Sequence, residues 1–343
     1  QDQEEKGYSI GGPIYIPKFF NTEKNKLFFF VNQEWAPRIT PNGAQNVRVP
    51  TALERAGDFS QSRDNNGNLF KTIKDPLSPL PCNSTATDAV PLGCFADGGV
   101  LGKIPIARFY SLGQKILNLF PLPNATGTNF NYTSQLSNNT VERSDTVRID
   151  YNITENWRVY GRMLNNVNYA DLPYASLGFI LGGNLDTFKW RNNTPRISYA
   201  GTVNGTLSPT MAVEFTYGFS KNTIEGRMTD DLYTRTATGL TGLPLVYPGA
   251  VQEDLLSQFS FGARIGNNPS VRTGNGPFLN SNRTDDISGT LSKVWGNHAT
   301  KFGGVYHWAN KQQTNRVQFN GNINFGENAN NPLDTGFGFA NAL

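Results

Sequence analysis

Hydrophobic and polar residues alternate strictly in several segments of the chain, most clearly between Met211 and Ser220. Side chains point alternately to the two faces of a β-strand, so this segment has one apolar face and one polar face. A soluble β-sandwich turns such an apolar face into its core, whereas a membrane β-barrel turns it to lipid. The apolar row consists of Met211, Val213, Phe215, Tyr217 and Phe219.

The same alternation recurs in four pairs of segments, and the two members of each pair are separated by a turn. Antiparallel neighbours joined in this way form a hairpin, and hairpins in series form a meander. The pattern therefore predicts an all-β fold, an antiparallel up-and-down meander of about eight strands. The apolar rows of the four pairs run over residues 8–16 with 27–35, 147–153 with 157–163, 197–207 with 211–219, and 287–291 with 302–308.

Long polar connections separate the pairs, so short turns alternate with long loops along the chain. In barrels of the bacterial outer membrane, short turns face the periplasm and long loops face the outside. A soluble sandwich has no reason to place all its long loops at one end. This regularity favours a piece of a larger transmembrane β-barrel. The long connections cover approximately residues 37–142, 168–193, 221–284 and 310 onward.

Four tryptophans share the apolar face and stand near the ends of strands, which is typical of aromatic girdles at the two membrane interfaces. The opposite face of the second hairpin is rich in charge, as expected of a wet lumen. These polar side chains would line a substrate path, hold a plug by charge pairing, or form a solvated wall. The girdle candidates are Trp35, Trp157, Trp295 and Trp308, and the lumen candidates are Arg148, Asp150, Arg158, Arg162 and Glu214.

The first long loop has helical signals of its own. Thr51 and Glu54 have the spacing of a capping box, which predicts a short helix. Five apolar residues between Ile106 and Leu119 recur at helical spacing, and Pro121 follows as a stop. Such a stripe belongs either to a packed cap over the loop or to an element that contacts a ligand, and packing is the commoner use.

Composition narrows the alternatives. The 343 residues include 35 Gly and 20 Pro, which suits many short strands joined by turns. No run of about 18 apolar residues encodes a transmembrane helix. The net charge is only +3 and no block of Lys and Arg stands out, so a nucleic-acid partner is not expected.

The two cysteines, Cys82 and Cys94, belong to one loop and do not have the spacing of metal ligands. A disulfide formed in an oxidising compartment is the favoured interpretation, and two reduced thiols are the alternative. No residue set has the pattern of a catalytic or metal centre. The histidines, His298 and His307, form no triad or ligand set. We therefore expect no enzyme activity, no metal and no cofactor.

Several motifs, in order, resemble the start of the barrel in Oar-like TonB-dependent receptors of the outer membrane. The most specific is the string VPTALERAGDFS at residues 49–60, which is similar to a signature of that family's first long loop. The resemblance covers most of residues 7–167 and is looser beyond them. The other matching motifs are at residues 11–14, 24–30, 75–76, 104–108, 119–124, 145–151 and 158–162.

The resemblance implies a large barrel around a plug domain, in a receptor that often carries a carboxypeptidase-regulatory-like domain. Transporters of this size have 22 strands around a plugged lumen. The chain would then be a fragment, because the plug and the segment that contacts TonB would precede it. We expect residues 1–36 to hold the plug tail and first hairpin, 37–142 a long extracellular loop with short helices, and 143–343 further hairpins and loops of one incomplete barrel.

The sequence thus predicts part of a receptor in the outer membrane of a Gram-negative bacterium, for energised uptake of a large scarce nutrient such as a siderophore, glycan or peptide. Its expected partners are outer-membrane lipid, its own plug, the TonB complex and an extracellular ligand. Two alternatives stay open. One is an outer-membrane adhesin or structural barrel without transport. The other is a soluble secreted β-sandwich that binds a partner.

Overall fold

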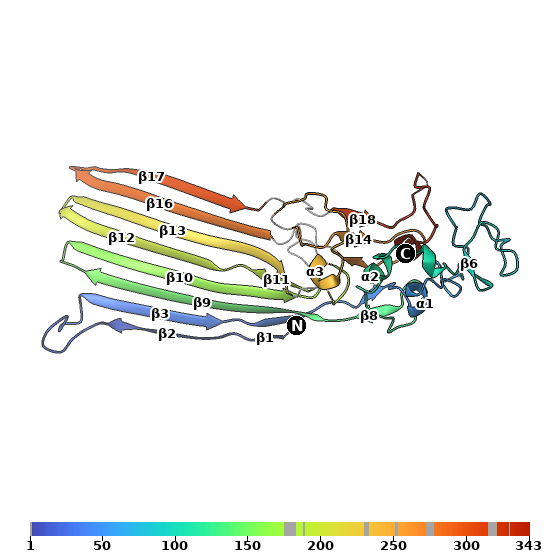
Figure 1. The fold of residues 1–343 in the computed structure, drawn as a ribbon. Helices are drawn as coiled ribbons and strands as arrows, with labels where there is room; N and C mark the ends of the chain where they lie inside the picture. The colour runs from blue at the N-terminus through green and yellow to red at the C-terminus, as the bar shows by residue number, and fades with distance from the viewer. Residues whose placement is uncertain are drawn as a thin grey trace.

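The computed structural model describes residues 2–174, 183–187, 189–229, 233–250, 253–271, 278–314, 321–328 and 330–343. A long antiparallel sheet forms one end of the molecule and a compact module of loops forms the other (Figure 1). The sheet has 11 strands, and three of its passes are each split into two strands, which leaves eight passes. The predicted all-β meander of about eight strands is therefore confirmed.

Each pass of the sheet pairs with its neighbours in the chain, in antiparallel register throughout. The split passes are β1 with β2, β3 with β4, and β11 with β12. The strands of the sheet are β1 (Asp2–Gln3), β2 (Lys6–Pro13), β3 (Leu27–Trp35), β4 (Arg38–Pro41), β9 (Ser137–Asn152), β10 (Trp157–Leu172), β11 (Trp190–Asn193), β12 (Arg196–Ser208), β13 (Met211–Met228), β16 (Phe278–Trp295) and β17 (His298–Gln313).

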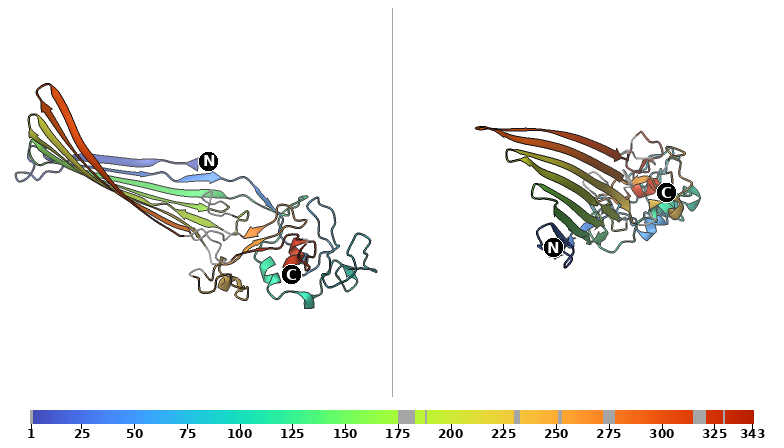
Figure 2. Two further views of the ribbon diagram at one scale, coloured as in Figure 1. Left: turned by 90° about the horizontal axis from the view of Figure 1, so that it is seen from above. Right: turned by 90° about the vertical axis from the view of Figure 1, so that its left-hand side faces the viewer.

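The sheet is open among the described residues, because β2 pairs only with β3 and β17 pairs only with β16. A closed eight-stranded barrel would join its first and last strands, so the sheet has the form of an arc. Figure 2 shows that this arc is twisted and curved. Such a surface is what one section of a wide barrel wall requires.

All turns between paired passes are at one end of the sheet, at the left of Figure 1, and all long loops are at the other end. The turns span residues 14–26, 153–156, 209–210 and 296–297. The strands extend further toward the long loops than the alternation predicted. For example, β9 begins at Ser137 and β13 continues to Met228, where both faces carry polar residues and the hydrophobic signal is absent.

The apolar rows fall on one face of the sheet, as register shows. Val147 pairs with Val31 and with Met163, which puts the three side chains on the same face. Much of this face is uncovered, since Phe302 is 62% exposed and Tyr306 is 65% exposed. A β-sandwich would bury these rings under a second sheet. The other sheets of the described chain are small and belong to the loop module, so the sandwich alternative is wrong.

The buried hydrophobic core of the molecule lies in the loops instead. Four segments supply it: the first long loop, the neighbourhood of Leu185, the connection that precedes β16, and the chain after β17. Val49, Phe259 and Phe337 are each at most 1% exposed within it. We call this unit the loop module. Its strands and helices are β5 (Gln45–Val47), α1 (Ala52–Arg55), β6 (Ala96–Asp97), β7 (Val100–Leu101), α2 (Gly113–Leu117), β8 (Tyr132–Ser134), α3 (Arg235–Thr238), β14 (Gln258–Ser260), β15 (Ser270–Val271), β18 (Asn322–Asn324) and α4 (Gly338–Ala342).

The helical signals of the first loop are partly correct. The capping box at Thr51 is present: its hydroxyl accepts from the Glu54 N–H and the Glu54 carboxylate accepts from the Thr51 N–H. The apolar stripe from Ile106 to Leu119 does not form one continuous helix. The chain forms a 3₁₀ turn at Ile106–Arg108 and then α2, each short enough to pack separately. Ile116 is buried at 1% exposure, whereas Ile106 is 81% exposed.

Candidate functional site

The five polar residues predicted for a lumen share the face opposite the apolar rows. Arg162 pairs with Arg148, Tyr160 with Asp150, and Arg158 with both Asn152 and Asn204. Glu214 joins the same face because it pairs with Asn204. The register therefore gathers Arg148, Asp150, Arg158, Arg162 and Glu214 on one wall, which we call the polar wall.

Two of these residues neutralise each other. Arg148 donates to Asp150 from Nε and Nη2, both at 2.7 Å, and its guanidinium stands 4.5 Å from the Tyr160 ring centre. The pair is partly exposed, with 44% and 28% of the two side chains open. Planar bidentate geometry makes this one of the stronger kinds of ion pair. It fixes these two side chains along the wall and leaves their remaining surface to solvent.

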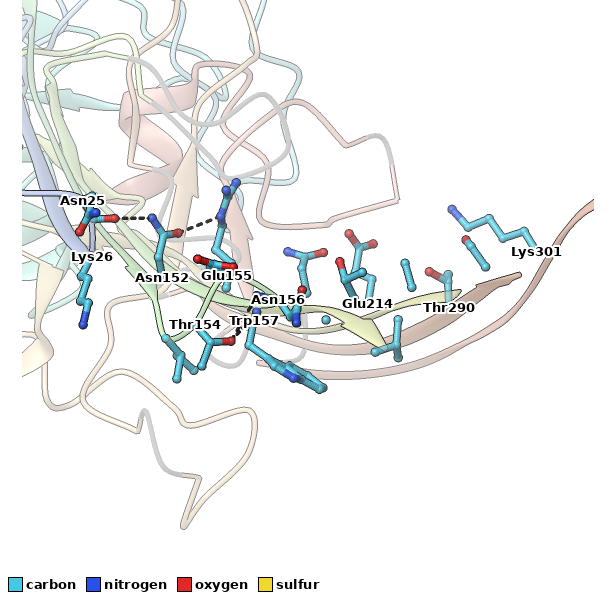
Figure 3. Close-up of a pocket in the computed structure, with 18 residues that line it drawn as sticks. Asn25, Lys26, Asn152, Thr154, Glu155, Asn156, Trp157, Glu214, Thr290 and Lys301 are labelled. Carbon is cyan, nitrogen blue, oxygen red and sulfur yellow. Dashed lines mark hydrogen bonds between the residues drawn. The ribbon is translucent and has the colours of Figure 1, made fainter. Parts of the chain in front are cut away.

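Arg158 belongs to a chain of hydrogen bonds that ties the polar wall to the first turn. Its Nε donates to Asn152 Oδ1 at 3.0 Å, and Asn152 Nδ2 donates to the Asn25 carbonyl at 2.8 Å (Figure 3). Arg162 forms no ion pair within 4.0 Å among the described residues. The polar wall thus carries one ion pair, Arg148–Asp150, and one arginine, Arg162, that forms no ion pair among the described residues.

A hollow of about 860 Å³ opens on the polar wall near the short-turn end of the sheet. Its floor comes from β10, β12, β13 and β16, and its sides come from the turns (Figure 3). Arg158 and Glu214 reach it from the wall, and Lys26 and Lys301 from its margins. The lining is mainly polar, so water or a polar surface fits there better than an apolar ligand.

The structure also pairs His307, which the sequence left as a lone histidine, with Asp286. The two residues are opposite each other on β17 and β16, and His307 Nδ1 is 2.5 Å from Asp286 Oδ1. They continue the level of Arg162 along the polar wall, through Ala200 and Gly218. The short turn at residues 296–297 fixes this register. Counting residues equally far before and after that turn would have paired His307 with Asp286 from the sequence.

The four predicted girdle tryptophans are all at least partly exposed on the apolar face, and register gives their levels. Trp35 pairs with Arg143, which pairs with Val167, so Trp35 is ten residues from Trp157 along the strand direction. Trp308 pairs with Asp285, which is likewise ten residues from Trp295. Ten residues span about 33 Å of strand, and with the usual tilt this becomes about 25 Å of height.

Toward the loop module, bonded polar side chains appear on the same face as the apolar rows. Asp145 accepts from Gln33 at 2.6 Å and from Asn165 at 3.1 Å. Four strands further along the sheet, on β16, Asp285 accepts from Arg283 at 2.8 Å and from the Tyr217 hydroxyl at 2.7 Å. These bonded polar groups mark the upper edge of the apolar band.

The loop module is held by a disulfide and by a buried ion pair. Cys82 and Cys94 are bonded, at a sequence separation of 12. Arg48 Nη2 lies 2.5 Å from Glu54 Oε1, and the Ser62 hydroxyl donates to the same oxygen at 2.7 Å. Glu54 is 1% exposed. Its charge is therefore matched by a cation and two neutral donors, as burial requires.

Hydrogen bonds shift the ionisation of several groups in the loop module. Burial raises the pKa of Asp75, but the Arg108 guanidinium and the Leu77 N–H outweigh it and hold that pKa below its usual range. Burial raises the pKa of the Tyr132 phenol, and its hydrogen bond to Asp186 raises it further. Both groups thus keep their ordinary charge state at neutral pH.

Neither a metal centre nor a spanning helix emerges from the described part of the chain. No group of three or more His, Cys, Asp or Glu among those residues could hold a metal ion. No helix within the described ranges is long and apolar enough to cross a membrane. We take the polar wall and the loop module as the candidate sites of function.

Comparison with known proteins gives one clear match. A family model described as "Outer membrane beta barrel domain" matches residues 1–343. No curated protein and no solved structure matches the chain. An outer-membrane barrel turns apolar side chains to lipid and polar ones to its lumen, which accounts for the uncovered rings of one face and the charges of the other. The chain belongs to the outer membrane β-barrel family.

Proposed function

We propose that the chain forms the lumen wall and extracellular cap of an Oar-like TonB-dependent receptor in a Gram-negative bacterium. The receptor takes up a nutrient too large for a porin, such as a siderophore complex, a glycan or a peptide. The supporting observation is the polar wall, whose side chains leave a hollow of about 860 Å³ and whose sheet is an open arc. An eight-stranded barrel fills its interior with side chains, whereas a wide one leaves room for a plug and a path.

The polar wall supplies the contacts that such a receptor needs. Arg162 and Glu214 would bind the receptor's own plug or line the path of the ligand, while the Arg148–Asp150 pair would keep a neutral stretch on β9, beside Arg162. The proposal includes TonB and an extracellular ligand as partners. It assigns the chain no catalytic step and no cofactor.

The loop module supports capture of a ligand from outside. Its four segments share one hydrophobic core, so the exposed surface above the barrel is a folded unit with fixed side-chain positions. Pre-organised surfaces bind with a smaller entropic cost than mobile loops. The girdle tryptophans and the apolar rows would fix its height above the outer leaflet.

A second candidate is an adhesin or structural barrel. It is favoured by the exposed apolar side chains near the Cys82–Cys94 disulfide, in a part of the loop module that we call the outer lobe. Leu77 is 71% exposed and Val90 is 57% exposed on this lobe, at the far right of Figure 1. Exposed apolar groups on a rigid lobe suit contact with another protein. An adhesin would use this surface and would not need a charged lumen.

Growth competition in the native host separates the two candidates. A deletion strain is complemented with the wild-type gene, with Arg162→Glu, or with the matched control Arg63→Glu, which reverses an exposed loop charge. Cultures are limited in turn for iron supplied as a siderophore complex, for a glycan and for a peptide. Uptake predicts a defect in one medium for the deletion and for Arg162→Glu, not additive with loss of TonB. A deletion defect confined to surface attachment would instead establish the adhesin.

A further inference from the structure

The turn between β2 and β3, residues 14–26, is the longest of the four turns at the short-turn end of the sheet. It exposes a row of apolar side chains. Ile14 is 37% exposed, Ile16 is 54% exposed and Phe19 is 87% exposed. A large aromatic ring left open on a turn costs hydration free energy unless a partner covers it.

The turn is nevertheless a built structure. Asn21 is 6% exposed, and its Nδ2 donates to the carbonyls of Ile14 at 2.7 Å and Leu27 at 3.1 Å. Its Oδ1 accepts from the Lys26 N–H at 2.8 Å. Asn21 therefore clamps both arms of the turn and holds the exposed tip in place.

The turn also holds three residues in the left-handed backbone conformation. Lys18, Asn21 and Lys24 have φ values of 66°, 51° and 55°. Few residues other than Gly take this left-handed conformation without cost. Strain of this kind persists where the surrounding structure fixes a shape with a use.

The turn is positively charged. Lys18, Lys24 and Lys26 are exposed and Glu23 is the only acidic residue of the turn, so its net charge is +2. Lys24 Nζ stands 4.6 Å above the Tyr15 ring. Apolar side chains beside ammonium groups form the pattern that binds the interface of an anionic bilayer.

The level of the turn matches that interface. The Ile14 N–H donates to the Leu27 carbonyl at 2.9 Å, and Leu27 pairs with Tyr151, which pairs with Val159. Val159 is two residues from Trp157. Ile14 and Ile16 are separated from Ile10 by an even number of residues, so they fall on the same apolar face. They extend the apolar row to the level of Trp157.

We propose that this turn is a membrane anchor that binds anionic phospholipid of the periplasmic leaflet. Ile16 and Phe19 enter the boundary of the acyl chains, and Lys18 and Lys24 contact lipid phosphates. The anchor goes beyond the proposed transport function and does not depend on it, because it requires only that the barrel spans the membrane.

A fluorescent reporter beside the ring tests the anchor. The full-length protein carrying Thr22→Cys is labelled with an NBD fluorophore and placed in vesicles of phosphatidylethanolamine and phosphatidylglycerol. Asn297→Cys, on the short turn between β16 and β17, is the matched control. The native Cys82 and Cys94 are bonded and do not compete for label. We expect quenching by doxyl-labelled lipid and a several-fold weaker quenching by iodide at Thr22 than at Asn297.

Two further variants identify the groups responsible. Ile16→Ser with Phe19→Ser should raise iodide quenching at Thr22 to the level of Asn297, while heat-modifiable mobility on gels verifies that the barrel is folded. In the wild-type turn, quenching at Thr22 by doxyl-labelled lipid should increase with the phosphatidylglycerol content of the vesicles. Lys18→Gln with Lys24→Gln should remove this dependence. Equal iodide quenching at Thr22 and Asn297 would overturn the proposal. Shielding from both quenchers would also overturn it, since a protein would then cover the turn.

Discussion

Phe215 stands directly opposite Gly289 across the β13–β16 pair, so no side chain lies directly across from its ring on that strand. The ring is 48% exposed, at the middle of the apolar row that begins at Met211. In the outer membrane, lipid fills the space that the glycine leaves. The exposure of this ring thus indicates which face of the sheet contacts lipid.

Phe215→Lys should destabilise the barrel by about 2–4 kcal/mol, the cost of a lysine on the lipid face near the bilayer centre. Thr290→Lys is the matched control, because Thr290 pairs with Glu214 on the polar wall. The free energy of unfolding in lipid vesicles, measured by urea titration, checks the difference. Equal stability of the two variants would contradict the orientation of the faces.

Loss of the disulfide should loosen the outer lobe without changing the sheet. Cys82→Ser with Cys94→Ser opens a loop closed over 12 residues, and closure of a loop near this length stabilises by about 2–4 kcal/mol. Limited proteolysis of intact cells should then cut between the two positions. The wild type treated with a reductant should give the same fragments, whereas cleavage within the sheet would argue for a global effect.

Glu54→Ala should strongly destabilise the loop module. Arg48 would keep a buried charge without its partner, which costs about 3–5 kcal/mol, and α1 would lose its capping box. Hydrogen exchange of α1 and its neighbours measures the loss. A double variant, Arg48→Met with Glu54→Leu, should recover much of the protection, because apolar residues of similar size leave no unpaired charge. Equal exchange in both variants would refute the charge argument.

The end of the chain should lose stability in acid because of Asp334. Burial raises the pKa of Asp334, but the N–H groups of Gly336 and Asn328 and the Asn341 amide outweigh it and lower the pKa. A folded-state pKa below the unfolded value near 3.9 gives a stabilisation that is complete well above that value. It is lost as pH falls through the folded-state pKa. Hydrogen exchange of residues 335–343 between pH 3 and 6 should show this, and Asp334→Asn should flatten the profile.

The sequence predicted the membrane part of the sheet because one face is apolar at every second residue from Met211 to Phe219. It missed the extensions of β9 and β13 because polar residues on both faces give no alternation, although backbone pairing continues. The disulfide was predicted correctly, since both cysteines belong to one loop. The helical spacing over residues 106–119 did not reveal two separate elements, because spacing alone does not distinguish one helix from two short elements that share a core.

The core of the loop module was beyond sequence reasoning. It brings Val49 together with Phe259 and Phe337, which lie more than 200 residues from Val49 in the sequence and carry no local signal. The polar wall was predicted from parity, but the pairing of His307 with Asp286 required the register of two strands. Alternation therefore identifies a face, and only the three-dimensional pairing identifies which groups on it meet.

The closure of the loop module over α4 sets an order on biogenesis. Arg48 stacks on Phe339, and Gly113 of α2 lies against the backbone of Ala342 so closely that a Cβ would meet its carbonyl oxygen. Residues near the start of the chain thus complete their packing only after residues 337–343 have been made and carried outward. Hairpins can enter the membrane one after another, but the cap must wait for residues 337–343, which follow the β16–β17 hairpin, so its assembly comes after that of the hairpins before them.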